Sequence, residues 1–163
     1  MILKLKNKDK LVVGDFIFRC AIGKNGISKN KKEGDGKSPQ GKFGLGTVYW
    51  RSDRIKKPIT KIKCEKIKKD IGWCDDINSK FYNKKVKLNK KFRCEKLFRK
   101  DNKYDLIIVI NYNTKKIVKN KGSAIFIHLT NNYKPTAGCL AVKEKDMFII
   151  LKLINKNSKI LIN

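Results

Sequence analysis

The sequence has few acidic residues and no long apolar run. Its 163 residues include 41 Lys and Arg against 14 Asp and Glu, which gives a formal net charge of +27 with histidine neutral. No apolar stretch approaches the roughly 18 residues that cross a bilayer as a helix, and the first ten residues lack the continuous apolar segment of a secretory signal. The sequence therefore predicts no transmembrane segment. We expect the protein to stay inside the cell, to leave it by another route, or to have further sequence before this start.

Metal-binding patterns are missing as well. The chain has one histidine and no C-x-x-C pair, so a structural zinc site is not expected, and neither is any other metal or organic cofactor. An odd number of cysteines leaves at least one thiol free, while disulfides among the first four stay open. The five are Cys20, Cys64, Cys74, Cys94 and Cys139.

Arginine is scarce although the chain is strongly basic. Only five of the basic residues are Arg, and the Lys residues are spread along the whole chain. A dedicated nucleic-acid binder more often concentrates Arg, with aromatic residues between for stacking on bases. Lys, Asn and Ile also share A/T-rich codons, so genome composition explains much of the charge. We expect no nucleic-acid partner, and a basic module that binds a polyanion is the alternative.

What the sequence does contain is a series of short apolar segments separated by turn residues, which predicts a mainly β fold. One helix is expected over Glu144–Ile154, where apolar residues recur at helical spacing and acidic residues occupy the first turn. A β-sandwich or barrel with one or two short helices buries the apolar faces of such strands, and we expect this architecture. We also expect one domain over residues 1–163. Strands are expected at Ile2–Lys6, Leu11–Val13, Asp15–Ile22, Phe43–Trp50, Tyr104–Tyr112, Ser123–Leu129 and Lys159–Ile162.

His128 and Cys139 are the candidate chemical groups. His128 lies on the apolar segment SAIFIHL, and Cys139 follows Gly138 at the end of a loop. Each has a structural explanation, because a lone histidine on an apolar strand is commonly a core residue and free cysteines are among the most buried residues. Together they form a base on a strand and a nucleophile on a turn. Backbone N–H groups at Gly138 and Cys139 are then candidates for stabilising an oxyanion.

These motifs resemble the signature of the L,D-transpeptidase catalytic domain family (YkuD-like), in particular a small single-domain branch. The signature has a histidine on a strand followed by a [Ser/Thr]-x-Gly-Cys turn, here SAIFIHL and PTAGCLA. Further stretches resemble the same branch: EGDGKSPQGKF (Glu33–Phe43), GWCDD (Gly72–Asp76) and YDLIIVINYN (Tyr104–Asn113). The resemblance extends from about Arg19 to Met147.

The resemblance implies a β-rich catalytic domain, with Cys139 as nucleophile and His128 as its base. It implies peptidoglycan stem peptides as partners, cleavage of the bond between an L-centre and D-Ala, and transfer of the acyl group to an amine, giving a 3→3 cross-link. Water as acceptor gives an L,D-carboxypeptidase instead. The implied location is the periplasm or cell envelope, although the lack of a readable signal leaves a cytoplasmic location open. A monomer is expected.

Several residues around this pair have two interpretations. Thr136 and Tyr133 are either substrate-facing or part of turn and packing, and His128 needs a partner that orients its ring. A backbone carbonyl is the preferred partner, with Asp75 or Asp76 as the side-chain alternative. The chain has Ala137 and Ala141 where the family usually has His and Arg or Asn. These departures keep open a third interpretation, a family member that binds peptidoglycan without catalysis.

Overall fold

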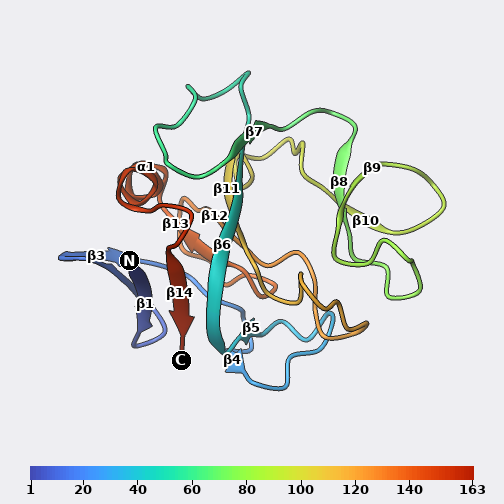
Figure 1. The fold of residues 1–163 in the computed structure, drawn as a ribbon, viewed down its shortest axis with the longest axis horizontal. Helices are drawn as coiled ribbons and strands as arrows, with labels where there is room; N and C mark the ends of the chain where they lie inside the picture. The colour runs from blue at the N-terminus through green and yellow to red at the C-terminus, as the bar shows by residue number, and fades with distance from the viewer.

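A computed structural model describes all of residues 1–163, and most of its strands join one curved nine-stranded sheet (Figure 1). The strand order is β13-β12-β11-β6-β14-β1-β2-β3, and β7 pairs with β6 at its side. The members are β1 (Ile2–Lys6), β2 (Lys10–Val13), β3 (Phe16–Arg19), β6 (Gly41–Trp50), β7 (Cys64–Lys66), β11 (Leu106–Ile110), β12 (Phe126–Leu129), β13 (Leu140–Val142) and β14 (Lys159–Ile162).

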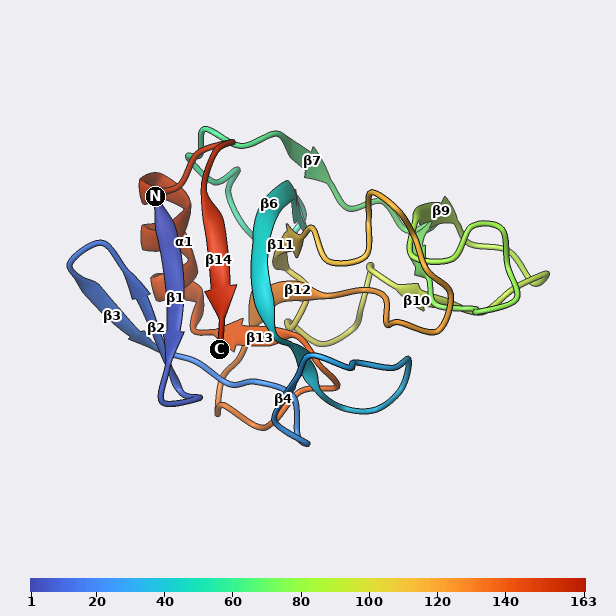
Figure 2. The ribbon, with the colours of Figure 1, turned by 60° about the horizontal axis from the view of Figure 1, so that its bottom comes forward.

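Backbone hydrogen bonds join the two ends of this sheet. Ala21, just after β3, donates its N–H to the carbonyl of Ala141 in β13 at 2.8 Å and accepts the N–H of Ala141 at 2.9 Å. Thr136 extends the contact, since its N–H donates to the carbonyl of Ile22 at 2.9 Å. The sheet is therefore a nearly closed barrel, which confirms the predicted mainly β architecture. Strands β1 and β14 run parallel side by side within it (Figure 2).

The single helix, α1 (Glu144–Leu153), packs its apolar side into the main core. Met147, Ile150 and Leu151 are fully buried. No side chain caps the first turn, although Glu144 and Asp146 lie there as predicted. Packing of the apolar face is thus the main source of stability for so short a helix. The prediction of a helix here is confirmed, with its end at Leu153.

The lysine-rich middle of the chain, which the sequence left unassigned, forms a separate small sheet. Its strands are β8 (Ile71–Cys74), β9 (Lys85–Lys87) and β10 (Cys94–Lys96), in the order β10-β8-β9. Strands of three or four residues are too short to show a period in the sequence. A further two-stranded pair, β4 (Ile27–Ser28) and β5 (Ser38–Pro39), lies within the predicted long loop Lys29–Phe43 and just before it.

Aromatic residues join the small sheet to the barrel. Trp73 of β8 packs edge-on against Phe126 of β12, with ring centroids 5.2 Å apart, and its indole N–H donates to Asn83 Oδ1 at 2.8 Å. Tyr104 packs against the same Phe126 ring. This second core, separate from the main one, belongs to the outer side of the barrel wall. It positions the small sheet beside Phe126, the first residue of β12.

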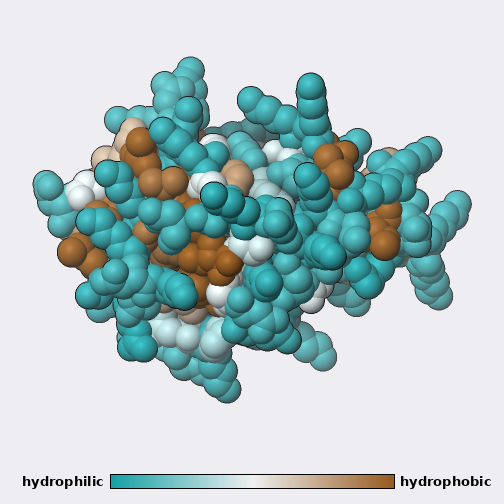
Figure 3. Space-filling model, turned by 90° about the horizontal axis from the view of Figure 1, so that it is seen from below, coloured by the Kyte–Doolittle hydropathy of each residue, from teal (hydrophilic) through white to brown (hydrophobic).

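The outer surface is mostly hydrophilic. Figure 3 shows one face covered largely by hydrophilic residues, with hydrophobic ones gathered toward the end where the N-terminal strands lie. All five cysteines are free thiols. The structure contains no helix with the length and hydrophobicity needed to cross a membrane.

Candidate active site

The strand register places His128 and Cys139 on the same face of the sheet. Strands β12 and β13 run parallel, with His128 opposite Ala141. Cys139 lies two residues before Ala141, and side chains alternate along a strand, so the thiol and the imidazole share a face as diagonal neighbours. Both side chains are buried, and both line one cavity of about 780 Å³. The structure thus brings together the two groups that the sequence singled out.

A backbone carbonyl orients the imidazole. His128 Nδ1 lies 2.9 Å from the carbonyl oxygen of Leu129. A carbonyl only accepts, so Nδ1 carries the hydrogen and Nε2 keeps the lone pair that can take a proton. Neither predicted carboxylate contacts the ring: Asp75 pairs with Arg93, and Asp76 Oδ1 accepts the N–H of Asn78. The carbonyl, not Asp75 or Asp76, occupies the orienting position.

The thiol and the imidazole are both neutral at rest. Burial raises the pKa of Cys139 to about 12, and the nearby charge of Glu95 contributes to the same rise. Burial lowers the pKa of His128 to about 4. The Cys139 Sγ donates to the carbonyl of Ala124 at 3.2 Å and accepts the N–H of Phe126 at 3.3 Å. No thiolate–imidazolium ion pair therefore exists in the resting site.

The turn before Cys139 contains one of the two backbone N–H groups predicted to bind an oxyanion. Thr136 Oγ1 donates to the carbonyl of Cys139 at 2.6 Å and accepts the N–H of Gly138 at 3.1 Å. The predicted oxyanion donor at Gly138 is therefore already engaged, because the threonine hydroxyl closes the turn. The N–H of Cys139 has no partner within the protein. Of the two predicted backbone donors, only that of Cys139 is free.

Gly138 is required by the conformation of this turn. Its φ is +146°, and a Cβ there would lie 2.8 Å from the carbonyl oxygen of Lys37. The loop with Lys37 is held against the turn by buried Ser38, whose Oγ donates to the carbonyl of Gly138 at 2.9 Å. Ser38 Oγ also accepts the N–H of Gly23 at 3.0 Å. The long loop of the sequence thus supports the turn that carries the thiol.

Thr136 lies in the wall of the cavity, whereas Tyr133 lies outside it. Thr136 lines the cavity, where its hydroxyl stabilises the turn. Tyr133 does not line the cavity. Its ring lies under the guanidinium of Arg19, 4.5 Å from the centroid, so its role is packing and the predicted cleft position is not observed.

Several cavity residues were not identified from the sequence. Tyr104 lies beside the imidazole, with ring centroids 5.4 Å apart, and its hydroxyl donates to Glu95 Oε1 at 2.5 Å. The guanidinium of Arg99 lies over the Tyr104 ring, 5.1 Å from its centroid. Lys31 and Glu33 reach the cavity from the opposite loop. Glu33 and Tyr104 each begin a stretch that resembles the family, but neither was identified as a cavity residue. No motif marks Lys31 or Arg99, because the cavity residues converge from distant segments of a lysine-rich chain.

The burial of His128 leads to a pH-dependent stability. Its pKa is about 4 in the folded protein against 6.5 for an unperturbed histidine, with Lys103 and Arg99 also lowering it and Asp101 raising it. Between these values the unfolded chain binds a proton that the folded chain does not. The free energy of unfolding should therefore fall as pH drops from 6.5 to 4, by about 3 kcal/mol. Urea unfolding at several pH values should show a smaller fall for His128→Gln. An equal fall in both proteins would contradict a buried neutral imidazole.

A thiol, a neutral base with a fixed tautomer and a free backbone N–H form a set that can transfer an acyl group through a thioester. The family model for the YkuD L,D-transpeptidase catalytic domain matches residues 2–162. The chain therefore belongs to the L,D-transpeptidase catalytic domain family, whose substrate is peptidoglycan and whose members are usually associated with the cell envelope. No curated protein and no solved structure was found to match this chain.

Proposed function

We propose that this protein is a cysteine-dependent L,D-transpeptidase acting on peptidoglycan stem peptides at the cell envelope, with residues 1–163 as one catalytic domain. One observation carries the proposal: Cys139 and His128 line the same cavity, inside a chain that the family model covers almost completely. The proposed reaction has two halves, formation of a thioester and its transfer to an amine.

In the first half, His128 Nε2 takes the thiol proton while Cys139 Sγ attacks the carbonyl carbon of the L-centre. The carbonyl oxygen becomes an oxyanion, which the free N–H of Cys139 can bind. The C–N bond to D-Ala then breaks, and the imidazolium gives its proton to the departing amine. A neutral histidine at rest suits this cycle, because it can both accept and return the proton.

In the second half, an amine of another stem attacks the thioester. His128 takes a proton from this amine, and the thiol leaves with a proton returned to it. The product is the 3→3 cross-link. Both signs of charge line the cavity, which supports a substrate that carries ammonium and carboxylate groups. The basic lining residues are Lys31, Arg93, Arg99, Lys103 and Lys134, and the acidic ones are Glu33, Asp75 and Glu95.

The direct test is incubation of the protein with a purified disaccharide tetrapeptide, with mass spectrometry of the products. The proposal expects release of D-Ala together with a 3→3 dimer. D-Ala and free tripeptide without dimer would indicate the carboxypeptidase reaction. No D-Ala release, with salt-sensitive binding to DNA or another polyanion, would reject the enzyme in favour of a basic binding module.

A further inference from the structure

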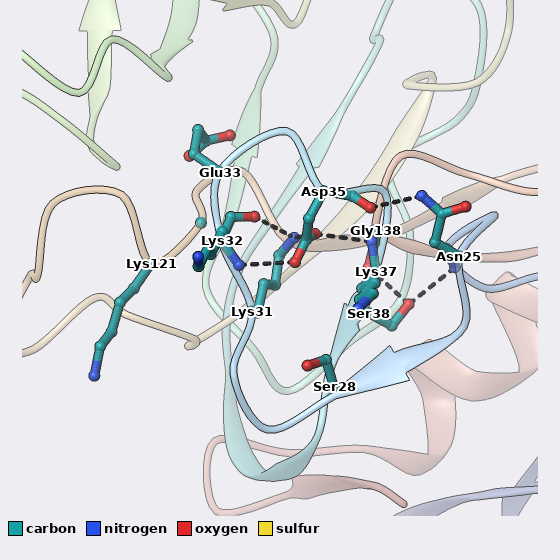
Figure 4. Close-up of polar contacts among 12 residues, drawn as sticks. Asn25, Ser28, Lys31, Lys32, Glu33, Asp35, Lys37, Ser38, Lys121 and Gly138 are labelled. Atoms are coloured by element: carbon teal, nitrogen blue, oxygen red, sulfur yellow. Dashed lines mark hydrogen bonds and ion pairs between the residues drawn. The ribbon is translucent and has the colours of Figure 1, made fainter.

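A buried ammonium group lies next to the catalytic turn. The Lys31 side chain is only 3% exposed, and its Nζ donates to Asp35 Oδ1 at 2.8 Å. Lys31 also lines the cavity that contains Cys139 and His128. Figure 4 shows the lysine inside its loop, with Asp35 and Gly138 close to it. On a surface rich in solvated lysines, this one is an exception.

Two glycines make room for this side chain. A Cβ on Gly122 would lie 2.7 Å from Lys31 Cε, and a Cβ on Gly138 would lie 3.3 Å from Lys31 Nζ. The ammonium therefore lies beside the residue that precedes the nucleophile. Its positive charge is close enough to Cys139 to lower the pKa of that thiol, against the larger effects of burial and Glu95.

The loop does not need Lys31 to hold Asp35 in place. The Asp35 carboxylate already accepts the backbone N–H groups of Lys32 at 2.7 Å and Lys37 at 2.9 Å. Burying a lysine costs free energy that an ion pair offsets only in part. A role for the ammonium in the cavity explains why it is held there.

The oxyanion site, in contrast, lacks a donor. The N–H of Gly138 is engaged by Thr136, which leaves only the N–H of Cys139. We propose that Lys31 supplies the second donor of the oxyanion site, in the role that the sequence suggested for the N–H of Gly138. This inference rests on the proposed function. When Cys139 attacks, the carbonyl oxygen gains the negative charge, the thiol proton is on His128, and the ammonium of Lys31 stabilises the oxyanion without transferring a proton.

The test compares Lys31→Met with two matched variants. Lys32→Met makes the same change one residue along, at an exposed side chain outside the cavity. Asp35→Asn breaks the same ion pair but keeps the lysine. For Lys31→Met we expect kcat for D-Ala release to fall on the order of 10²-fold, with KM changed less than about 3-fold. Lys32→Met should match the parent protein, and Asp35→Asn should lose thermal stability but keep kcat within about 10-fold.

A second readout does not depend on the substrate. Alkylation of Cys139 by iodoacetamide at about pH 8, followed by peptide mass spectrometry, should be about 3- to 10-fold slower in Lys31→Met, because one pKa unit is a tenfold change in thiolate. Cys64, half-buried and outside the cavity, is the internal reference. If the parent protein releases no D-Ala, the proposed function fails, and alkylation still tests the charge of Lys31.

Three results would overturn the inference. Equal losses of kcat and of melting temperature in Lys31→Met and Asp35→Asn would assign the lysine a structural role. A rise in KM alone would make it an anchor for a substrate carboxylate. An unchanged alkylation rate of Cys139 would show that the Lys31 ammonium does not stabilise negative charge on the Cys139 sulfur.

Discussion

Cys139→Ala is expected to abolish D-Ala release from a tetrapeptide stem, with a loss on the order of 10⁴-fold or more in kcat. The physical reason is that the methyl group of alanine cannot attack a carbonyl carbon, and His128 then has no thiol proton to accept. The fold should survive, because alanine fits the space and only two hydrogen bonds to the sulfur, from Phe126 and to Ala124, are lost. Product analysis measures the first effect, and circular dichroism with thermal melting measures the second.

Cys64→Ala is the matched control, because Cys64 is a half-buried thiol outside the cavity. It should retain full activity. Cys139→Ser is expected to be nearly inactive as well, since an imidazole with a pKa of about 4 is a weak base for a hydroxyl. Activity of Cys139→Ala above about a tenth of the parent would reject the mechanism and shift attention to Cys94, the other thiol lining the cavity.

Phe126→Ala is expected to lower the free energy of unfolding by about 3–5 kcal/mol, the usual cost of removing a fully buried aromatic ring. Phe126 is 0% exposed and packs edge-on against both Trp73 and Tyr104. Its removal takes away the contact that holds the small sheet against the barrel. The cavity should therefore lose its wall, and activity should fall together with stability. Urea unfolding and the D-Ala assay together measure both effects.

Phe81→Ala is the control for this second prediction. Phe81 packs against Phe92 but is 38% exposed, so its loss should cost less than about 1 kcal/mol. If Phe126→Ala also cost less than this, the small sheet would not depend on the contact. Backbone contacts alone would then have to hold the small sheet beside the cavity.

His128 and Cys139 could be singled out from the sequence because the chain offers few alternatives. There is one histidine, and only Cys139 follows a glycine at the end of a loop. The longer strands were equally readable, since runs such as Tyr104–Tyr112 are apolar and β-branched. The strand after Cys139, β13, was not predicted. The three-residue strands of the small sheet were not predicted either, because they are too short to show alternation and are rich in lysine.

The donors and partners around the pair could not be predicted, because local sequence does not show which hydrogen bonds a turn makes. Gly138 is compatible with a free N–H, and only the position of the Thr136 hydroxyl shows that this N–H is engaged. The carbonyl of Leu129 fills the role for which a backbone carbonyl was preferred, yet two carboxylates were also compatible with the sequence. The strand geometry selects the carbonyl.

The sequence by itself determined the longer strands, the helix and the family, because these depend on periodicity and on motifs within short stretches of chain. Tertiary structure alone decided which of 41 basic residues is buried beside the thiol, and it also decided that Cys139 and His128 are both neutral at rest. The physical reason is that pKa values and oxyanion donors depend on burial and on distances between segments far apart in the chain, such as those of Lys31 and Gly138. Only the closure of the barrel brings those segments together.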